Sequence, residues 1–160
     1  MSASDTMPPD SALRAVVPDT SVVLKWYLHR DEPEREQALT LRRAYLKATL
    51  RLMVPDLLFY EVANVLRYKP GWDSARVSQA VASLFALKLD IVPVTDGLLQ
   101  RAVALAFDHD IAVYDAAFVA LAQDVGAHYV TADRKLARKL AKFGTIHSLT
   151  TLPLNGLGAD

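Results

Sequence analysis

Short apolar runs rich in β-branched residues alternate along the chain with longer segments in which apolar residues recur every three or four positions. The short runs have the length and composition of buried strands, and the longer segments have the period of amphipathic helices. The predicted strands are AVV (15–17), LMVP (52–55), DIVPV (90–94), HYVT (128–131) and TIHSL (145–149). The predicted helices are 21–28, 32–50, 74–88, 95–110, 114–127, 133–143 and one that follows LMVP and contains 59–68. This alternation indicates an α/β fold, a three-layer sandwich around a largely parallel central sheet of about five strands.

The pattern predicts one domain over residues 14–150, because no repeat, low-complexity segment or long linker divides the chain. A chain of 160 residues can bury a core without metal or disulfide staples. Residues 1–13 are small, polar and proline-bearing, without the charged and apolar regions of a signal peptide, and are predicted to be a disordered tail. Residues 151–160 are predicted to be a C-terminal tail. No apolar run approaches the roughly 20 residues that span a bilayer, so we expect no membrane association.

The amino-acid composition excludes several kinds of catalytic and metal-binding site. The chain has no cysteine, which excludes zinc–thiolate sites, thiol catalysis and disulfides and fits a cytoplasmic location. Lys+Arg and Asp+Glu balance at 18 each, so a polyanion would have to be held by a local patch or through a metal ion. The histidines show no paired ligand spacing and are interpreted as scattered surface or strand-edge residues: His29, His109, His128 and His147.

The segment FYEVANVLRY (59–68) places Glu61 and Asn64 one turn apart on an otherwise apolar helix. Burying an unpaired carboxylate costs several kcal/mol or raises its pKa until it binds a proton. Glu61 therefore lies either on a solvated stripe of the helix or in a cleft that uses its charge.

Three aspartates join Glu61 near the ends of predicted strands or the starts of helices. Asp19 follows the first strand, Asp115 opens the helix YDAAFVALA, and Asp133 follows the strand HYVT. In open α/β sheets ligands bind at the edge formed by the carboxyl ends of the strands. We therefore expect the four acids to converge on one cleft.

A simpler explanation applies to each aspartate alone. Aspartate is a preferred helix N-cap and complements the positive end of the helix dipole, so each of the three fits a cap as well as a ligand. Asp56, Asp73 and Asp96 are predicted to be caps. Glu61 is different, because it lies about five residues inside its helix, and its alternative is the solvated stripe.

The chain is similar to a known family in four segments. DTSVVLKWYL, VPDLLFYEVANVL, YDAAFVALA and VTADRKL, in that order and with one of the four candidate acids in each, resemble the signature segments of PIN-domain ribonucleases, above all the VapC toxins of toxin–antitoxin pairs. The likeness runs from about Val16 to about His147. It implies a PIN-like fold and a metal-dependent endoribonuclease that cleaves RNA phosphodiesters, with Mg²⁺ as cofactor and Mn²⁺ as a substitute.

The resemblance also implies roles for the acids. Asp19 and Asp115 would be direct metal ligands, and Glu61 and Asp133 would complete the catalytic pocket through bound waters or at a second metal. The chemistry agrees, because clustered carboxylates repel one another unless they are protonated or meet a hard cation. A metal-activated water can then attack a phosphodiester in line.

Further residues are candidates around this pocket. We expect side chains near the acids to orient bound waters: Thr20, Ser21, Asn64 and Thr131. For contacts to the RNA backbone the candidates are Arg134 and Lys135, with Lys25 and Arg67 as further possibilities.

The resemblance implies protein partners as well. A VapB-like antitoxin would hold the nuclease inactive and reach an arginine into the acidic pocket, and the protein would form a homodimer. The predicted anchors for the antitoxin are Trp26, Tyr27, Tyr45 and Leu46, and the helix of Ser74 to Lys88 is expected to supply part of the dimer contact.

Three other functions were weighed. One is a PIN-fold nuclease of RNA processing without a toxin role, and another is a metal-free module that binds only protein. The third is a phosphotransfer receiver or an aspartate phosphatase, but these need an acidic pair after the first strand or an Asp-x-Asp motif. Asp19 is followed by Thr20 and Ser21, which supplies neither.

Overall fold

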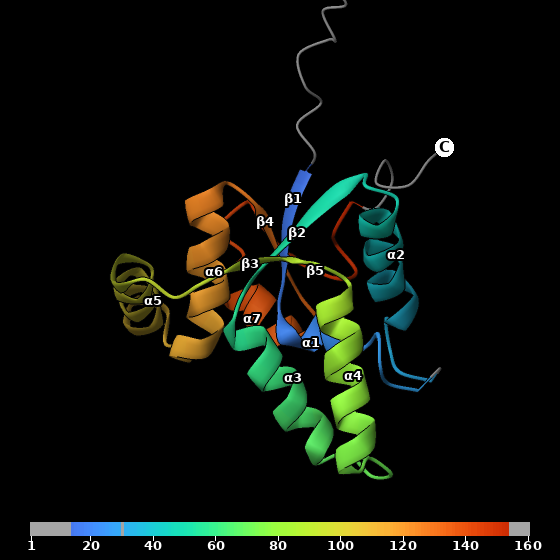
Figure 1. Cartoon of the computed structure of the whole chain (residues 1–160). Coiled ribbons are helices and arrows are strands. Elements are labelled where there is room, and N and C mark those ends of the chain that lie inside the picture. The colour runs from blue at the N-terminus through green and yellow to red at the C-terminus, as the bar shows by residue number, and fades with distance from the viewer. Residues whose placement is uncertain (1–13, 30, 154–160) are drawn as a thin grey trace, which may run out of the picture.

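The computed structural model describes residues 14–29 and 31–153. The predicted tail 1–13 and residues 154–160 lie outside the described residues. Five strands form one sheet in the order β3-β2-β1-β4-β5, and all four neighbouring pairs are parallel. The strands are β1 (Arg14–Pro18), β2 (Leu50–Pro55), β3 (Asp90–Val92), β4 (His128–Thr131) and β5 (Ile146–Ser148). The predicted α/β class with a parallel central sheet is confirmed (Figure 1).

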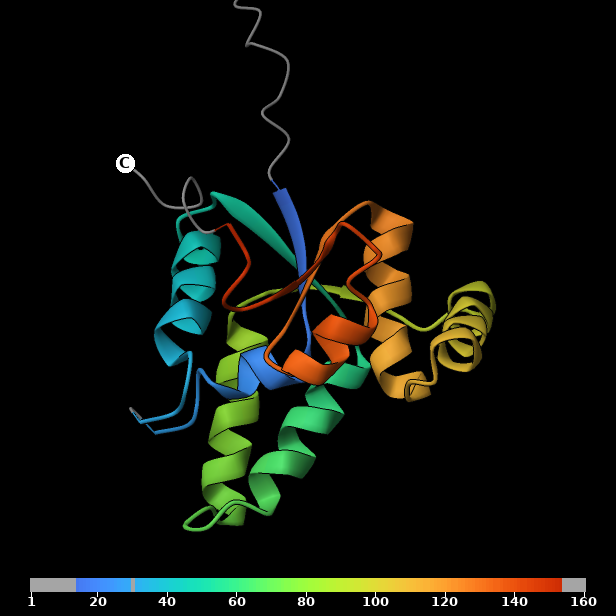
Figure 2. The ribbon, with the colours of Figure 1, turned by 180° about the vertical axis from the view of Figure 1, so that it is seen from behind.

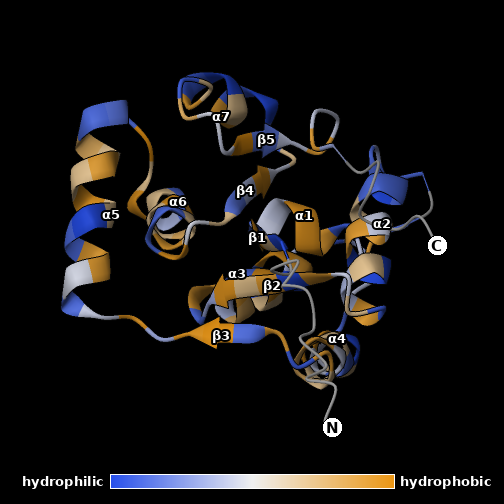
Figure 3. Cartoon of the chain, turned by 90° about the horizontal axis from the view of Figure 1, so that it is seen from above, coloured by the Kyte–Doolittle hydropathy of each residue, from blue (hydrophilic) through white to orange (hydrophobic). Residues whose placement is uncertain are grey.

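The helices cover both faces of this sheet. They are α1 (Thr20–Leu24), α2 (Arg35–Leu46), α3 (Leu57–Arg67), α4 (Ser74–Ala86), α5 (Asp96–His109), α6 (Val113–Val125) and α7 (Arg134–Lys139). Seen from above, α5, α6 and α7 lie on one side of the strands, and α1 and α2 lie on the other (Figure 3). The antiparallel pair α3 and α4 projects beyond the end of the sheet in both side views (Figures 1 and 2). None of the described helices is long and apolar enough to cross a bilayer.

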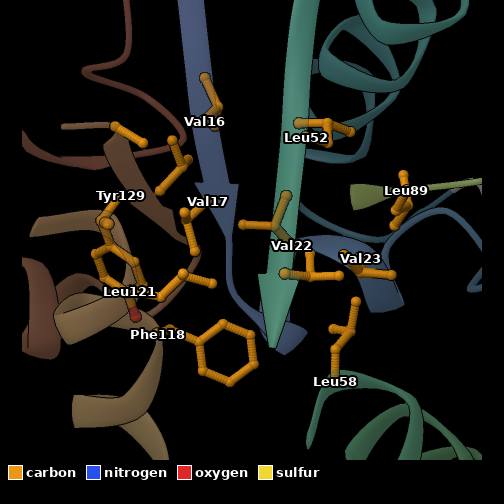
Figure 4. Packing of buried hydrophobic residues seen from close by; sticks show 14 of the residues in the cluster. Val16, Val17, Val22, Val23, Leu52, Leu58, Leu89, Phe118, Leu121 and Tyr129 are labelled. Atoms are coloured by element: carbon orange, nitrogen blue, oxygen red, sulfur yellow. The ribbon is translucent and has the colours of Figure 1, made fainter. Parts of the chain in front are cut away.

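The core is continuous on the two faces of the central strands. Val17 in β1 and Val130 in β4 are wholly buried, and on α6 the side chains of Phe118 and Leu121 are 1% exposed. Figure 4 shows Val17, Phe118 and Leu121 near Tyr129 of β4. Because both faces of these strands are covered, they read in the sequence as continuous apolar runs and not as alternating ones.

The order of the strands creates the place for a site. The chain runs outward from β1 through β2 to β3 and then returns to the other side of β1 as β4 and β5. The carboxyl ends of β1 and β4 therefore flank the point where the strand order reverses, which in open parallel sheets is where ligands bind. Asp19 directly follows β1, and Asp133 follows β4 after one intervening residue.

Some element ends differ from the prediction. The helix predicted over 32–50 runs only from Arg35 to Leu46, because Glu34 and Ala48 have left-handed backbone with φ 59° and 57°. The helix predicted over 21–28 ends at Leu24, and that predicted over 133–143 ends at Lys139.

Candidate active site

Asp19 is the most deeply buried of the four acids, at 5% exposed. Its Oδ1 accepts hydrogen bonds from the Ser21 hydroxyl and from the backbone N–H of Val22, so Asp19 caps α1. Its Oδ2 accepts a hydrogen bond from the hydroxyl of Tyr129 at 2.7 Å. Burial raises the pKa of Asp19, and the hydrogen bonds from Ser21, Thr131 and Tyr129 offset part of that rise.

Two hydroxyls join the turn after β1 to the turn after β4. Ser21 Oγ accepts from the backbone N–H of Ala132 at 2.9 Å and lies 3.4 Å from Thr131 Oγ1. Thr131 Oγ1 in turn accepts from the backbone N–H of Asp133 at 3.0 Å. The structure thus places Ser21 and Thr131 where they fix the two aspartates relative to each other, and their role toward waters stays a prediction.

Glu61 faces α1 and not a solvated stripe. It is half-buried on α3, and its Oε1 accepts a hydrogen bond from Thr20 Oγ1 at 2.9 Å. Burial raises the pKa of Glu61, and the charge of Asp19 adds to the rise. The helix therefore tolerates this carboxylate because a hydroxyl from α1 is its hydrogen-bond partner.

Asp115 shows that the four acids share one electrostatic environment. It lies in the first turn of α6, and its pKa is raised to about 6, first by burial and then by the charges of Asp19, Glu61 and Asp133. Three carboxylates from α1, α3 and α7 can act on Asp115 only if all lie near it. We call Asp19, Glu61, Asp115 and Asp133 the acidic cluster.

The cap predictions have mixed outcomes. Asp19, Asp73 and Asp133 are N-caps whose side chains accept a backbone N–H, from Val22, Arg76 and Leu136 respectively. The cap prediction is wrong for Asp96, because Thr95 caps α5, and the cap alternative does not hold for Asp115, because Ala112 occupies the N-cap position of α6. Asp56 occupies the cap position of α3 without a side-chain hydrogen bond.

The structure does not bring every predicted residue to the cluster. Asn64 is exposed and lines a hollow between α3 and α4 together with Arg67 and Trp72. Lys25 is 6% exposed, and its Nζ donates to Glu32 Oε1 at 3.1 Å and to Pro33 O at 2.6 Å, so it is engaged within the fold. The exposed Arg134 and Lys135 begin α7 beside Asp133.

Two side-chain contacts were not predicted from the sequence. Tyr129, on the neighbouring strand β4, donates a hydrogen bond to Asp19. Side chains alternate along a strand, so Tyr129 and Thr131 of HYVT lie on one face, and this is the feature of the sequence that could have indicated the contact. His128 and His147 are paired across β4 and β5, with Nδ1 and Nε2 2.9 Å apart, so the interpretation of the histidines as scattered was wrong for these two. Burial, with His128 alongside, lowers the pKa of His147.

The cluster suits a divalent cation in charge and in donor type. Carboxylate oxygens are the ligands that Mg²⁺ prefers, and it binds through one or two of them while keeping several waters. Among the described residues, no three acidic or histidine side chains already surround a common point. The assignment of Asp19 and Asp115 as its ligands, with Glu61 and Asp133 acting through bound water, stays a prediction.

Fold and site together define a class: a parallel α/β domain that gathers carboxylates where the strand order reverses. The model of the PIN domain family matches residues 16–142. Ribonuclease VapC3 of Pyrobaculum aerophilum is 35% identical over 136 residues, covering 78% of this chain and 93% of the relative. The chain belongs to the PIN domain family, in its VapC group.

Solved structures share the fold at lower identity. PAE2754 of P. aerophilum superposes with a TM-score of 0.65 at 23% identity, over 92% of each chain. A toxin–antitoxin complex from Klebsiella pneumoniae has a TM-score of 0.60 at 18% identity, over 84% of this chain and 97% of that one. VapC20 of Mycobacterium tuberculosis, described as a sarcin–ricin loop cleaving toxin, has a TM-score of 0.57 at 18% identity, over 73% and 87%.

Proposed function

We propose that this protein is a metal-dependent endoribonuclease that acts as the toxin of a toxin–antitoxin pair. The observation that carries the proposal is the pKa of Asp115, raised to about 6 by burial and by three acids from three other elements. Such a concentration of negative charge is unfavourable in an isolated protein and is relieved by a divalent cation. Membership of the VapC group, whose matched relative is named a ribonuclease, supports RNA as the substrate.

The residues of this chain have distinct parts in the proposed reaction. A bound Mg²⁺ would supply the Lewis acidity and the positive charge that phosphodiester hydrolysis requires. Asp19 and Asp115 would hold the ion, and the donors from Ser21 and Tyr129 keep the carboxylate of Asp19 in one orientation. Glu61, fixed by Thr20, accepts a proton from the attacking water, and its raised pKa brings it nearer to the range of an effective general base.

Cleavage of labelled RNA tests this mechanism. We expect cleavage with Mg²⁺ or Mn²⁺, none in excess EDTA, and none by Asp19→Asn in either metal. Undiminished cleavage in EDTA would contradict the metal mechanism. Full activity in the variant would show that the cleavage belongs to a contaminant or to another site. No metal binding and no cleavage at all would favour the protein-binding module.

Single-stranded RNA suits the site better than a duplex. The cluster lies at the edge formed by the carboxyl ends of the strands, and a flexible loop can adapt its backbone to such a site more readily than a rigid A-form helix. Arg134 and Lys135 are exposed at the start of α7, next to Asp133, and are positioned to contact backbone phosphates. Replacing Lys135 by alanine should raise KM and reduce the salt dependence of binding, with kcat nearly unchanged.

An antitoxin partner follows from the same proposal, because a solved structure of a toxin–antitoxin complex shares this fold. Its predicted anchors need correction. Trp26 is 8% exposed and donates from Nε1 to Ala38 O at 2.8 Å, so it belongs to the core. Tyr45 is half-buried and bonds to the carbonyls of Leu87 and Lys88 at 2.7 Å. Tyr27 is half-buried, and Leu46 is exposed.

The toxin role is tested in the native host, where the protein would act in the cytoplasm. We expect expression of the wild type to arrest growth, Asp19→Asn to be harmless, and a neighbouring antitoxin gene to relieve the arrest. Normal growth at a level where RNA cleavage is detectable would leave a nuclease of RNA processing.

A homodimer is the second proposed assembly, and the structure suggests a different contact from the one predicted. On α5, Leu99, Val103 and Phe107 form one exposed stripe at intervals of four residues, and Phe107 is 84% exposed. The stripe continues into a hollow of about 270 Å³ lined by Tyr60 and Tyr114, among others. The predicted α4 supplies one exposed large apolar residue, Phe85. Leu99→Glu should therefore convert a dimer to a monomer in light scattering, while a surface change on α2, Arg43→Glu, should not.

A further inference from the structure

Arg134, which directly follows Asp133 of the acidic cluster, is held by a residue far away in the sequence. Its Nη2 and Nε donate to Glu34 Oε1 at 3.0 and 3.3 Å. Glu34 occupies the N-cap position of α2, on the other side of the sheet from α7. Both donors of the guanidinium go to one oxygen, so the pair is not the usual bidentate one.

Glu34 is an unfavourable residue for its position. Its φ of 59° lies in the left-handed region, which few non-glycine residues adopt. Its side chain is only 10% exposed, and among the described residues its Oε2 is buried without a hydrogen-bond partner. Strained backbone and unpaired buried oxygens persist only where the surroundings fix them, and they gather at functional sites.

The segment before α2 is fixed independently of Arg134. The buried Lys25 donates to Pro33 O at 2.6 Å and to Glu32 Oε1 at 3.1 Å. Arg35 Nε donates back to Leu28 O at 3.2 Å. These hydrogen bonds fix the segment before α2 and therefore the position of Glu34. Arg134 of α7 takes the orientation in which it can donate to Glu34.

An unheld arginine at this position would interfere with the cluster. A guanidinium binds carboxylates strongly and bidentately, and Arg134 begins the helix that Asp133 caps. Folded back onto the cluster, it would neutralise the charge that a divalent cation needs. Glu34 satisfies two of its five N–H donors and leaves the others free for a phosphate.

We propose that Glu34 is a positioning residue that keeps Arg134 at the rim of the acidic cluster and out of it, so that the cluster stays open to a divalent cation. The inference rests on the proposed function, because it assumes that the cluster binds such an ion. It assigns Glu34 no contact with metal or RNA.

The test is Mn²⁺ binding measured by calorimetry on the full chain, without RNA. Glu34→Gln removes the charge that holds Arg134, and Glu34→Asn suits left-handed backbone and is too short to reach it. Both should weaken Mn²⁺ binding about fivefold, the scale of a favourable exposed ion pair. Arg134→Ala should bind at least as tightly as the wild type, and the double variant Glu34→Gln/Arg134→Ala should behave like Arg134→Ala.

The chain offers a matched control. Arg51 donates from Nη2 and Nε to one oxygen of Asp90, at 2.8 and 3.1 Å, at the opposite end of the sheet. Asp90→Asn releases Arg51 in the same way and should leave Mn²⁺ binding unchanged. A similar loss in this variant would mean that any lost surface charge weakens binding, and the proposal would be wrong.

The outcomes separate the two proposals. Wild-type affinity in Glu34→Gln and Glu34→Asn, or a double variant as weak as Glu34→Gln alone, overturns the positioning role while the metal site stands. Equal Mn²⁺ binding by wild type and Asp19→Asn, or no binding by either, overturns the metal site and the positioning role with it. Circular dichroism melting of every variant shows whether it is folded before binding is compared.

Discussion

Replacing Asp115 by asparagine should stabilise the metal-free protein at neutral pH. Asp115 carries a pKa of about 6 because burial and the charges of Asp19, Glu61 and Asp133 all disfavour its ionised form. Above that pH the wild type must hold a negative charge where three others already act on it. Asparagine has nearly the same shape without the charge, with an NH2 donor in place of one carboxylate oxygen, so the variant is free of that repulsion.

The size of the effect follows from linkage. The pKa of Asp115 rises from an ordinary 3.8 to about 6, and each unit is worth 1.36 kcal/mol, which gives about 3 kcal/mol for a fully buried group. Asp115 is half-buried, so solvent screening reduces this to about 1–2 kcal/mol. Between pH 3.8 and about 6 the folded state binds more protons than the unfolded state. Wild-type stability therefore falls as pH rises through that window, and the penalty is constant above it.

Urea unfolding in EDTA at pH 4.5 and 7.5 measures the difference. We expect Asp115→Asn to exceed the wild type by about 1–2 kcal/mol at pH 7.5 and by less at pH 4.5. With Mg²⁺ at a hundred times its dissociation constant, only the wild type should gain about 2.7 kcal/mol, which reverses the order. A variant no more stable than the wild type at pH 7.5 in EDTA would refute the electrostatic account of the cluster.

Three further predictions concern single side chains. Glu61→Gln should slow RNA cleavage about 10²–10³-fold. Its melting temperature in EDTA should not fall, because the change keeps the shape of the side chain and removes its charge. Turnover at the wild-type rate would mean that Glu61 has no part in the reaction. Tyr129→Phe should lower the free energy of unfolding by about 1–3 kcal/mol in urea titrations, because it leaves Asp19 Oδ2 buried without its donor; a change under about 0.5 kcal/mol would show that water replaces the hydroxyl. Asp73→Ala should lose about 1 kcal/mol with the cap of α4, and Asp56→Ala, which has no side-chain cap bond, should lose much less in the same titration; equal losses would contradict the cap assignment.

The fold was predictable because its information is local. Buried parallel strands appear as short β-branched runs, and every predicted strand has a counterpart in the sheet. The element ends were less predictable, since Glu34 and Ala48 adopt left-handed backbone that neither residue type favours. The start of α2 depends on the contacts of Lys25 with Glu32 and Pro33, and no periodicity in the segment itself contains them.

The site was predictable in its acids and not in their partners. The three aspartates follow a strand or lie in the first turn of a helix, and Glu61 lies in the second turn of α3, so the topology accounts for the aspartates more directly than for Glu61. Tyr129 and Asp19 are 110 residues apart, and Arg134 and Glu34 are 100 apart. Such pairings depend on strand order and side-chain direction, which one sequence does not reveal. Trp26 shows the same limit, because the sequence alone does not distinguish an aromatic residue exposed for partner binding from one buried in the core.

The contrast between cap and site disappears at Asp19 and Asp133, because each is both. Oδ1 of Asp133 accepts the backbone N–H of Leu136 at 3.0 Å, and Oδ1 of Asp19 accepts that of Val22. An N-cap uses one lone pair and fixes the carboxylate at the start of its helix, where the helix dipole also favours negative charge. A carboxylate held in this way needs no reordering to meet a cation at the same edge of the sheet. The strand-to-helix turn that requires a cap for stability thus also places charge at the proposed metal site, which explains why a parallel α/β sheet can gather acids from distant segments at little cost to its own folding.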